Sequence, residues 1–400
     1  MNAPHKFDTP VEHIRPFHAE LTAIRRDIHA HPELGFRESR TSELVARTLE
    51  SWGIEVHRGI ATTGVVGVIP GRSNASGRGV GLRADMDCLP MHESSNLPYK
   101  SVHAGCMHAC GHDGHTTMLL GTARYLAETR NFDGTAYVIF QPAEEGGGGG
   151  KAMVEEGLFE RFPANEVYAL HNWPGLPPGK IAVRPGPMMA AADELVVKVS
   201  GRGGHGAMPH LTVDPVVVTA QIITALQSIA SRNVSPTDAV VVSICSMSTS
   251  QVGAFNVIPD AVELIGTVRS FRPETRDLAE RRVHEIITGI AESMGATAKV
   301  DYRRGYPATV NTEREAAFAA RVGEKIFGKD NVLTAEDPTM GAEDFSYMLL
   351  ARPGAYVWLG QGGGPMGCFL HNPKYDFNDD VIPMGSGYLA ALVEEALPLK

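Results

Sequence analysis

A dense cluster of residue types that bind metals lies in the segment MHACGHDGH, residues 107–115. Four of them fall within six positions of the chain: Cys110, His112, Asp113 and His115. Thiolate, imidazole and carboxylate groups are the usual ligands of zinc and of neighbouring transition metals. Because one residue separates Cys110 from His112, both side chains can point from one tight loop to a single locus. The segment predicts a metal site, and the alternative is a surface loop in which these residues are incidental.

Two adjacent carboxylates follow the apolar run TAYVIF, in the segment QPAEEGGGGG at residues 141–150. In open α/β sheets, ligands bind beyond the carboxyl ends of the strands, where loops converge. Of Glu144 and Glu145, one can therefore ligate a metal while the other acts as general base on a metal-bound water. The five glycines let the backbone approach a substrate or reverse sharply. The alternative is a flexible acidic turn on the surface.

Two histidines further along the chain extend this set of donors. His171 follows the apolar run VYAL, and His371 lies in the loop segment FLHNPKYDFND. Taken singly, a histidine in such a place is more often a core residue, a cap or a surface-loop residue than a ligand. The two histidines form a set of five possible ligands with Cys110, His112 and one of the two glutamates. Five such residues are better explained by a single metal centre than by chance.

Two aspartates follow another strand-like run, in the segment RADMDCLP. Asp85 and Asp87 are two positions apart, and alternate residues of a strand face the same side, so both carboxylates can face the predicted site. A carboxylate that accepts the second N–H of a metal-ligating histidine is a common partner in such sites. For Asp85, an Asx-type turn after the strand is an equally good interpretation.

Three residues in a later part of the chain are candidates for contact with a substrate. His205 lies in the glycine-rich segment GRGGHGAMPH, Asn256 lies in NVIP, and Arg269 lies in GTVRSF. A histidine or an arginine held over a metal site can stabilise an oxyanion or bind a substrate carboxylate. The alternative is a hairpin loop and a strand arginine that is paired with a carboxylate.

The elements that must position these residues alternate between strands and helices. The runs with the length and composition of buried strands are residues 64–69, 79–85, 135–140, 167–171 and 355–360. The segments with helical spacing of apolar residues are residues 38–52, 115–129, 314–327 and 384–397. Such alternation predicts an α/β sheet with helices on both faces.

The stretch between residues 193 and 302 has a different order, which reads strand, helix, strand, strand, helix, strand. This β-α-β-β-α-β order is a split βαβ module that can stand alone as a domain. A chain of 400 residues is long enough for two domains. We therefore predict an α/β domain formed by residues 1–190 and 303–400, interrupted by a smaller inserted α+β domain at residues 191–302.

The composition excludes several classes of partner. The chain has 36 Lys and Arg against 46 Asp and Glu, a net charge of −10, and lacks the basic footprint that nucleic acids or anionic membranes require. No run approaches the ~18 apolar residues that span a bilayer, and the N-terminal residues lack the apolar core of a signal peptide. The five cysteines, an odd number in a long chain, do not form the pattern of a disulfide framework. We expect a protein of a reducing compartment, the cytoplasm.

The chain resembles the N-acyl-amino-acid amidohydrolases in six motifs, which occur in the family's order and span nearly the whole chain: MHACGHDGHTTMLLGTA, QPAEEGGGG, LHNWP, GRGGHGAMPH, NVIPD and GAEDFSYM. That family includes the hippurate hydrolases and the auxin-conjugate hydrolases, and it is more distantly related to aminoacylase and carboxypeptidase G. The resemblance implies a metallopeptidase-type α/β catalytic domain with an inserted lid and dimerisation domain. It also implies a small N-acyl amino acid as substrate and a homodimer or higher homo-oligomer.

The resemblance further implies roles for individual residues. Five residues match the ligands of two divalent metals, with zinc expected first and manganese, cobalt or nickel as alternatives: Cys110, His112, Glu145, His171 and His371. Glu144 matches the general base, and His205 matches a loop histidine that reaches the active site of a partner subunit. Asn256 and Arg269 are similar to residues that hold the carboxylate end of the substrate.

One position departs from the wider superfamily, in which many members carry His-x-Asp where this chain has Asp85-Met86-Asp87. A ligand histidine is thus absent, and in the branch that this chain resembles Cys110 is the compensation. Asp85 is for this reason a doubtful ligand, whereas Asp87 is expected to orient a ligand.

Together these residues suggest metal-dependent hydrolysis of the amide bond of an N-acyl amino acid, either hippurate-like or N-acetylated. Glu144 would take a proton from water and later donate it to the leaving amine, while the metal and His205 would stabilise the oxyanion. Three alternatives stay open: a metallo-dipeptidase or carboxypeptidase acting on short peptides, a metal-independent amidase with Cys110 as nucleophile, and a non-catalytic metal-binding protein.

Overall fold

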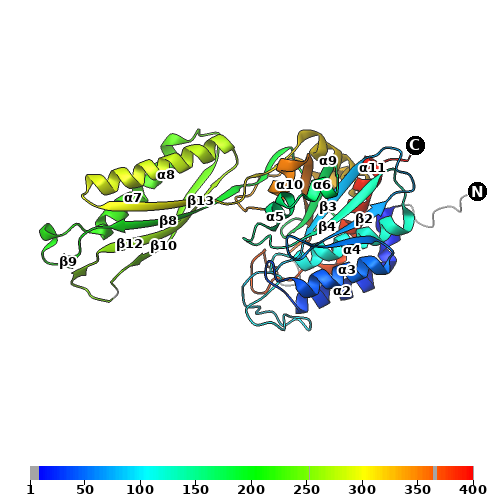
Figure 1. The fold of residues 1–400 in the computed structure, drawn as a ribbon, viewed down its shortest axis with the longest axis horizontal. Coiled ribbons are helices and arrows are strands. Elements are labelled where there is room, and N and C mark those ends of the chain that lie inside the picture. Colours follow the sequence, from blue (N-terminus) through cyan, green and yellow to red (C-terminus); the bar gives the residue numbers. More distant parts are fainter. Residues whose placement is uncertain (1–8, 252, 364–366, 400) are drawn as a thin grey trace, which may run out of the picture. The chain divides into compact units, whose positions relative to one another are not determined.

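The computed structural model describes residues 9–251, 253–363 and 367–399. Residues 1–8 lie outside the described residues. They begin the N-terminal segment that we expect to lack a signal peptide. The chain forms two compact units (Figure 1). The first unit comprises Met1–Met188, Val310–Asp337 and Asp344–Lys400, and the second unit comprises Met189–Thr309 and Pro338–Glu343.

The first unit is built on an eight-stranded sheet. Its strands, in the order in which they lie in the sheet, are β1 (Glu55–Ile60), β2 (Gly64–Pro70), β4 (Thr135–Gln141), β3 (Gly79–Asp85), β5 (Glu166–Trp173), β16 (Gly354–Gly360), β6 (Ile181–Ala182) and β15 (Val332–Leu333). The four central strands β4, β3, β5 and β16 run parallel, whereas β1 and β2 pair antiparallel. Every residue of β3 and of β16 is buried, as expected for parallel strands covered on both faces.

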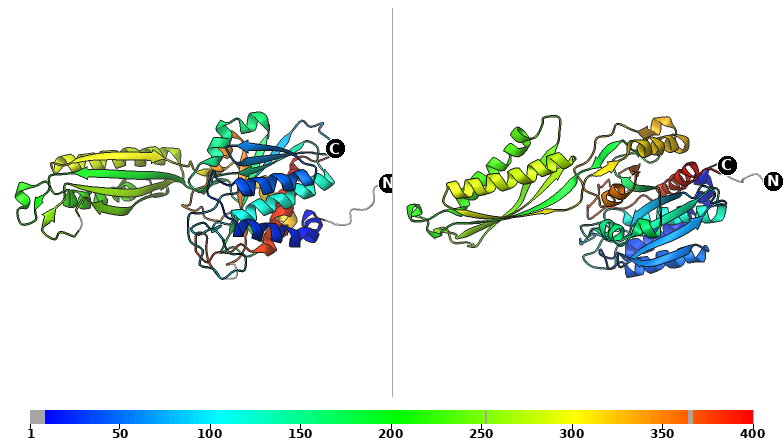
Figure 2. Two further views of the ribbon diagram at one scale, coloured as in Figure 1. Left: turned by 60° about the horizontal axis from the view of Figure 1, so that its bottom comes forward. Right: turned by 45° about the horizontal axis from the view of Figure 1, so that its top comes forward.

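Helices cover both faces of this sheet (Figures 1 and 2). The helices of one face are α3 (Ser39–Ser51), α4 (His112–Thr129), α9 (Glu313–Phe327) and α11 (Ile382–Ala396), with α1 (Pro10–Ile14) and α2 (His18–Ala30) packed on them. The helices of the other face are α5 (Gly149–Glu155), α6 (Leu158–Arg161) and α10 (Ser346–Ala351). This architecture confirms the predicted α/β sheet with a helical layer on each face.

The core on the α4 side follows from the alternation of side chains along the strands. Leu82, Phe140 and Leu170, from three neighbouring strands, belong to one buried cluster with Met118 of α4 and Leu389 of α11. Full burial of such a side chain stabilises the fold by about 1.5–3 kcal/mol. The strand ends at the edge of this cluster are therefore attached to a well-packed scaffold.

Helix α4 begins at His112, three residues before the position expected from helical spacing. As a result, His112, Asp113 and His115 all belong to the first turn or two of the helix, and every residue from His112 to Ala123 is buried. Burying polar side chains is unfavourable unless they are hydrogen-bonded or bind an ion. The buried polar side chains at the amino end of α4 therefore need hydrogen-bond partners or a bound ion.

The second unit contains a four-stranded antiparallel sheet. Its strands, in sheet order, are β10 (Val240–Thr249), β12 (Ala261–Ser270), β8 (Ala191–Ser200) and β13 (Thr297–Arg304), and its helices are α7 (Pro215–Leu226) and α8 (Pro273–Ser293). Leu195 and Val197 of β8 pack with Val283 and Ile287 of α8, so both helices cover one face of the sheet. A short ladder of β9 (Gly204–His205) with β11 (Val257–Ile258) also belongs to the second unit, whereas a ladder of β7 (Gly186–Met189) with β14 (Thr309–Asn311) lies mostly in residues of the first unit.

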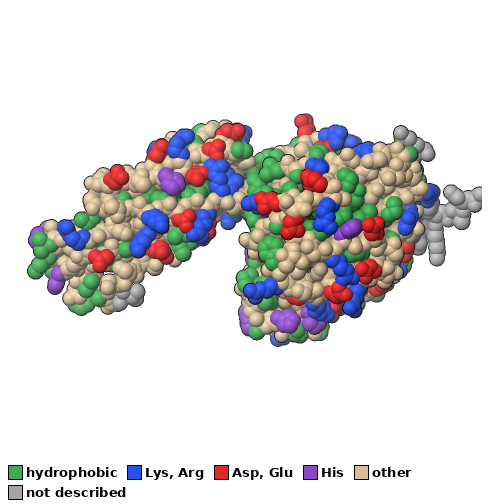
Figure 3. Space-filling view, viewed as in Figure 1, with side chains coloured by type: hydrophobic (Ala, Val, Ile, Leu, Met, Phe, Trp, Pro, Cys, Tyr) green, Lys and Arg blue, Asp and Glu red, His purple; other side chains and the backbone are tan. Residues whose placement is uncertain are grey.

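The surface carries charges of both signs. On the face drawn in Figure 3, Lys and Arg side chains are interspersed with Asp and Glu side chains over each unit. Among residues 9–251, 253–363 and 367–399, no helix combines the length and the apolar character that crossing a membrane takes.

Candidate metal centre

The candidate site lies in the first unit, where the carboxyl ends of three parallel strands meet the amino end of α4. Asp85 is the last residue of β3, Glu144 and Glu145 follow β4, and His171 lies near the end of β5. Parallel neighbours bring their carboxyl ends to one edge of the sheet, which is where ligands bind in open α/β folds. The strand order therefore collects residues that are far apart in the sequence.

Gly111 determines how the chain enters α4 between Cys110 and His112. Its backbone is left-handed, with a φ of 94°. A β carbon at this position would lie 2.3 Å from Asn172 Oδ1 and 2.6 Å from the hydroxyl oxygen of Tyr375, closer than van der Waals contact permits. Only glycine meets both the conformational and the steric requirement. The sharp turn that results leaves Cys110 and His112 in one group of donor atoms.

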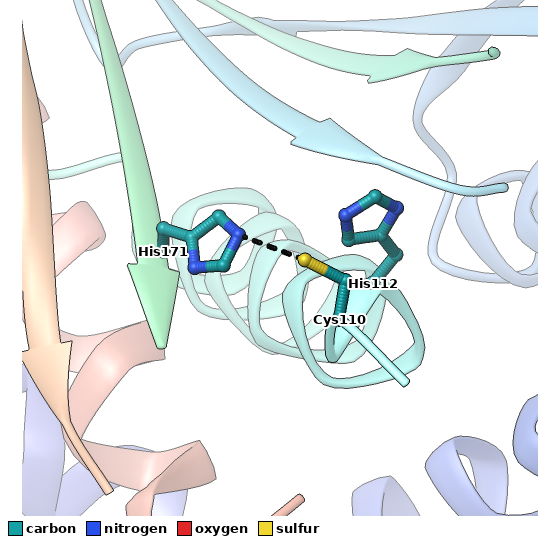
Figure 4. A group of neighbouring side chains, drawn as sticks. All are labelled: Cys110, His112 and His171. Atoms are coloured by element: carbon teal, nitrogen blue, oxygen red, sulfur yellow. Dashed lines mark hydrogen bonds between the residues drawn. The ribbon is translucent and has the colours of Figure 1, made fainter. Parts of the chain in front are cut away.

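Cys110, His112 and His171 form the first group of donors (Figure 4). Nε2 of His171, on β5, lies 3.5 Å from Sγ of Cys110, and the imidazole of His112 lies beyond the thiol. One donor atom from each residue lies within 4.8 Å of the other two, and all three side chains are buried. A thiol and two imidazoles at this spacing have the chemistry of ligands of a single cation.

A second group consists of Cys110, Glu145 and His371. His371 Nε2 lies 3.4 Å from Glu145 Oε1. The backbone of His371 is left-handed, with a φ of 61°, and its N–H donates to Ala109 O at 2.8 Å. Such a conformation is uncommon for a residue other than glycine and often marks a functional constraint. Because the two groups share Cys110, the structure brings together all five residues predicted as metal ligands.

The hydrogen bonding around these residues fits a bound cation. His112 Nε2 and Glu145 Oε1 are both buried, lie 4.0 Å apart and make no hydrogen bond to any residue that the structure describes. An unpaired buried polar atom costs about 1–3 kcal/mol. A cation held by each of the two donor groups would give both atoms a partner and remove this cost, so the donor set fits transition metals.

The protonation states of two donors point the same way. Burial, followed by the Glu145 carboxylate, raises the pKa of the Cys110 thiol to about 12. Without a cation the thiol therefore keeps its proton at neutral pH, whereas metal ligation requires the thiolate and releases that proton. Burial, followed by the charge of His115, holds the pKa of His171 well below its usual range. Its imidazole is thus neutral, which is the form that binds metals.

Asp87, predicted to orient a ligand, contacts two of the candidate ligands. Nδ1 of His112 donates to the Asp87 carbonyl oxygen at 2.9 Å and lies 3.3 Å from Asp87 Oδ1. The N–H of Glu145 donates to Asp87 Oδ2 at 2.9 Å. Because Nδ1 of His112 is engaged in this way, Nε2 is the nitrogen that faces the candidate metal position. Asp87 therefore fixes both the ring of His112 and the backbone of Glu145.

Asp85, the doubtful ligand, is held by other residues. Arg83 donates to Asp85 Oδ2 at 2.7 Å, and His115 Nδ1 donates to Asp85 Oδ1 at 2.6 Å. Burial would raise the pKa of Asp85, but the charges of His112, Arg83 and His115 outweigh it and hold the pKa well below the usual range. Asp85 Oδ2 lies 3.7 Å from His112 Nε2, so the carboxylate is a neighbour of the donors.

His115 has a role that sequence reasoning missed. Besides donating to Asp85 through Nδ1, it lies with Nε2 2.5 Å from the side-chain oxygen Oδ1 of Asn172, and its ring lies against the ring of His171 with centroids 4.4 Å apart. His115 thus links the end of β3 to the end of β5. The available signal was its spacing: three residues after His112, it lies on the same side of α4.

Asp113, from the same cluster in the sequence, belongs to a separate buried network. Its Oδ2 accepts from His29 Nδ1 at 2.8 Å and from Arg25 at 3.4 Å. Although burial opposes ionisation, the charge and the hydrogen bond of His29 lower the pKa of Asp113. Asp113 therefore anchors the amino end of α4 to α2 and is absent from the two groups that share Cys110.

Glu144, predicted as the general base, lies beside the candidate ligands. It is almost fully buried, and one of its oxygens lies within 4.8 Å of donor atoms of His112 and Glu145. It belongs to neither of the two groups that share Cys110. A carboxylate next to a metal position but outside its ligand set can exchange protons with a water there.

The three predicted substrate-binding residues lie in the second unit. His205, on β9, pairs with Val257 of β11, and its exposed side chain accepts the N–H of Ala207 at 3.1 Å. Asn256 is exposed and accepts the Gly206 N–H at 2.7 Å through its backbone oxygen, so the structure brings Asn256 next to the His205 loop. Arg269 lies on β12, and the described residues form no ion pair with it, which disfavours the salt-bridge alternative.

Comparison with known proteins gives a family. The family model described as "Peptidase family M20/M25/M40" matches residues 81–395. The chain is 42% identical over 382 residues to the hippurate hydrolase of Campylobacter jejuni, covering 96% of this chain and 98% of that protein. It is 37% identical over 382 residues to the N-acetylcysteine deacetylase of Bacillus subtilis, covering 94% and 97% of the two chains.

A solved structure of high similarity is that of the Bacillus subtilis YXEP protein, described as a dinuclear metal binding peptidase from the M20 family. The TM-score is 0.81 at 33% sequence identity, and the match covers 96% of this chain and 99% of that one. The likeness therefore extends over both units of the chain.

Proposed function

Because the chain belongs to peptidase family M20/M25/M40, we propose that it hydrolyses the amide bond of N-acyl amino acids, releasing a carboxylic acid and a free amino acid. The substrates that we expect are hippurate-like or N-acetylated amino acids. Two relatives are named for such reactions, a hippurate hydrolase and an N-acetylcysteine deacetylase. The observation that carries the proposal is that five candidate metal donors form two groups that share Cys110, with the buried Glu144 beside two of the donors, His112 and Glu145.

Two divalent cations would be held by the two donor groups. The first group would use Cys110, His112 and His171, and the second would use Cys110, Glu145 and His371. When bound, divalent cations polarise a carbonyl oxygen and lower the pKa of water towards neutrality. Zinc is the metal that we expect first from thiolate and imidazole donors, and manganese, cobalt or nickel are the alternatives.

Glu144 would act as the general base and then as the general acid. Its carboxylate takes a proton from the attacking water and later gives it to the nitrogen of the leaving amino acid. Its neighbour Glu145 is directed towards His371 and His112, which leaves the two adjacent carboxylates with different tasks. Asp87 supports this division because it holds the N–H of Glu145 in place.

We further propose that residues of the second unit take part in the reaction, with His205 reaching the active site of a partner subunit, as the family resemblance implies. His205 would stabilise the oxyanion of the tetrahedral intermediate, and its exposed side chain is available for this. Asn256 and Arg269 would hold the carboxylate of the substrate. Arg269 supports this role because it is half-buried and the described carboxylates form no ion pair with it.

We also propose that the second unit forms a homodimer or higher homo-oligomer, as the family resemblance implies. Large apolar side chains are exposed on and around the β9–β11 ladder, namely Met208, Leu211, Phe255 and Val257. Exposed apolar clusters of this kind mark surfaces that bind other proteins. Strand β10 has a free edge in its sheet, and such edges are open to pairing with another chain.

Two alternatives lose support from the geometry. A metal-independent amidase needs a thiolate nucleophile, whereas burial raises the pKa of Cys110 to about 12. A non-catalytic binding protein would have no use for the buried Glu144 beside its ligands. A dipeptidase or carboxypeptidase differs only in the acyl group of its substrate and stays the alternative within the metal-dependent class.

We place the protein in the cytoplasm. Cys110 can ligate a metal only as a reduced thiolate, which a reducing compartment preserves. The net charge of −10 and the mixed charges of the surface support a small-molecule substrate over a nucleic acid or an anionic membrane as partner.

A substrate panel tests the proposed function. The purified protein, reconstituted in turn with Zn²⁺, Mn²⁺, Co²⁺ and Ni²⁺, is assayed for release of free amino acid from hippurate, N-acetyl amino acids and dipeptides. We expect turnover of N-acyl amino acids to exceed that of dipeptides. Faster hydrolysis of dipeptides would favour the peptidase alternative, and full metal occupancy without hydrolysis of any substrate would contradict an enzymatic role.

A further inference from the structure

A buried carboxylate outside the donor groups holds the loop that carries Glu144. Glu38 lies immediately before α3 and is fully buried. Its Oε1 accepts the N–H of Ala143 at 2.8 Å, and its Oε2 accepts from the hydroxyl of Thr63 at 2.6 Å. Glu38 is thus bound to the residue that directly precedes the proposed general base, across 105 positions of the sequence.

Ala143 has a backbone conformation that needs such support. Its φ is 52°, in the left-handed region that residues with a β carbon rarely adopt. Both of its backbone polar groups are bonded, because the N–H donates to Glu38 and the carbonyl oxygen accepts the N–H of Gly149 at 3.0 Å. Two glycines leave room for it: a β carbon at Gly35 would lie 2.9 Å from Ala143 Cβ, and one at Gly147 would lie 2.7 Å from it.

The backbone on either side of Glu144 is consequently fixed by two carboxylates. Glu38 holds the N–H of Ala143, and Asp87 holds the N–H of Glu145 at 2.9 Å. The left-handed residue lies two positions after the end of β4, and its conformation decides where the side chain of the next residue, Glu144, points. A small change in that direction would move the Glu144 carboxylate, the proposed proton acceptor, relative to the metal donors.

We propose that Glu38 is a positioning residue of the hydrolytic reaction, which holds Ala143 in its left-handed conformation and thereby sets the position of Glu144. The inference rests on the proposed function. What Glu38 contributes is a pair of oxygens in a fixed place, not a charge: a glutamine can accept from Ala143 through Oε1, and its amide can donate to the Thr63 hydroxyl. Burial raises the pKa of Glu38, which is consistent with a site that does not depend on its negative charge.

The test compares Glu38→Ala and Glu38→Gln with a matched control, Glu156→Ala. Glu156 makes the same kind of bond elsewhere in the first unit, since its Oε2 accepts the N–H of Ala61 at 2.7 Å and Ala61 is also left-handed, with a φ of 47°. Each variant is prepared as the metal-reconstituted protein, and kcat, KM, metal content and melting temperature are measured with hippurate and N-acetyl amino acids.

We expect Glu38→Ala to lower kcat about a hundredfold, because a displacement of about 1 Å at a reacting group has an effect of this size. KM should change less than about threefold, and the metal content should equal that of the wild type. Glu38→Gln should restore kcat to within about threefold, and Glu156→Ala should retain the wild-type kcat. A role limited to folding would lower the melting temperature, and kcat corrected for the folded fraction of the protein would then equal that of the wild type.

Thr63→Val provides a second route if Glu38→Ala does not fold. It removes one of the two bonds that hold the Glu38 carboxylate and should lower kcat by about fivefold at unchanged metal content. Wild-type kcat in Glu38→Ala, loss of metal in that variant, or failure of Glu38→Gln to restore kcat would each overturn the inference. Absence of hydrolysis by the wild type would instead overturn the proposed function and this inference with it.

Discussion

The proposed metal ligands of the first unit and the proposed substrate-binding residues of the second unit are held in opposite ways. His112 is buried, and its Nδ1 is fixed by Asp87, while His171 lies against His115. His205, in contrast, is exposed on a two-residue strand and accepts one hydrogen bond, from its neighbour Ala207. The contrast teaches that the two functions need different surroundings. Metal ligands are buried and held in place by neighbouring side chains, whereas substrate-binding residues must be accessible. Substitutions in the two regions should therefore be separable by what they change.

Removal of the metals should have the largest effect, because the proposed reaction depends on the cations held by the ligands of the first unit. Prolonged treatment with a strong chelator should reduce hydrolysis to background, and added Zn²⁺ or Mn²⁺ should restore it. The measurement is turnover together with metal content, and a chelator already saturated with Zn²⁺ serves as the control. Activity that survives complete loss of metal would favour Cys110 as a nucleophile. It would also contradict the role of the buried residues of the first unit as metal ligands.

Glu144→Ala should lower kcat by about 10³–10⁴-fold while the metal content stays at the wild-type level. The loss is at the upper end of what a general base contributes, and Glu144 lies outside the two groups that share Cys110. The matched variant is Glu145→Ala, which should lose metal as well as turnover. If Glu144→Ala loses metal and Glu145→Ala keeps it, the roles of the two carboxylates are reversed.

His205→Ala should lower kcat by about 10²–10³-fold, the effect of removing one group that stabilises an oxyanion. Because the side chain is exposed, we expect the melting temperature and the metal content to stay unchanged. His210→Ala, another exposed histidine of the second unit, is the control and should behave as the wild type. A wild-type kcat in His205→Ala would remove this residue from the reaction, and loss of metal would blur the distinction between the two regions.

Asp87→Asn should weaken metal affinity by about 10–100-fold, as substitution of a residue that orients a ligand does. The variant keeps an oxygen for one of its two partners but no longer has a charged carboxylate between His112 and Glu145. Affinity is measured by competition with a chelator of known affinity. Asp133→Asn, at a buried carboxylate near the amino end of β4, should leave the affinity unchanged. Equal effects of both substitutions would indicate a general loss of stability.

Arg269→Met should have the smallest effect, an increase of about tenfold in KM with little change in kcat. An ionic hydrogen bond to a substrate carboxylate contributes about 1.5–3 kcal/mol, and partial compensation by Asn256 would reduce the loss. The decisive control is a substrate whose carboxylate is replaced by a carboxamide, for which wild type and variant should have the same KM. An equal increase for both substrates would show that Arg269 does not bind the carboxylate.

Much of the fold and the donor set could be predicted from the sequence because both leave local signals. Buried strands appear as continuous apolar runs, and the Cys-x-His spacing of residues 110–112 is visible in a single loop. The start of α4 was harder, because its N-cap is the left-handed Gly111, which provides no side-chain cap. The usual signals of a helix start are therefore missing there.

The partners of the site residues could not be predicted in the same way. His115 reaches Asp85 over 30 positions, and Glu38 reaches Ala143 over 105 positions, with nothing in either local sequence to pair them. Only the order of the parallel strands decides which loops become neighbours, and that order is a property of the packed sheet. The conformation of Ala143 is likewise invisible in the sequence, because alanine is not a residue that signals a left-handed backbone.

Gly111 has a consequence for how this centre tolerates mutation. Since a β carbon there would overlap both Asn172 and Tyr375, a saturation library at this position should retain activity for glycine alone. Relief would require simultaneous changes at two residues that themselves hydrogen-bond each other at 2.7 Å. A path of single substitutions therefore cannot replace Gly111 and keep activity, because Asn172 and Tyr375 would have to change at the same time.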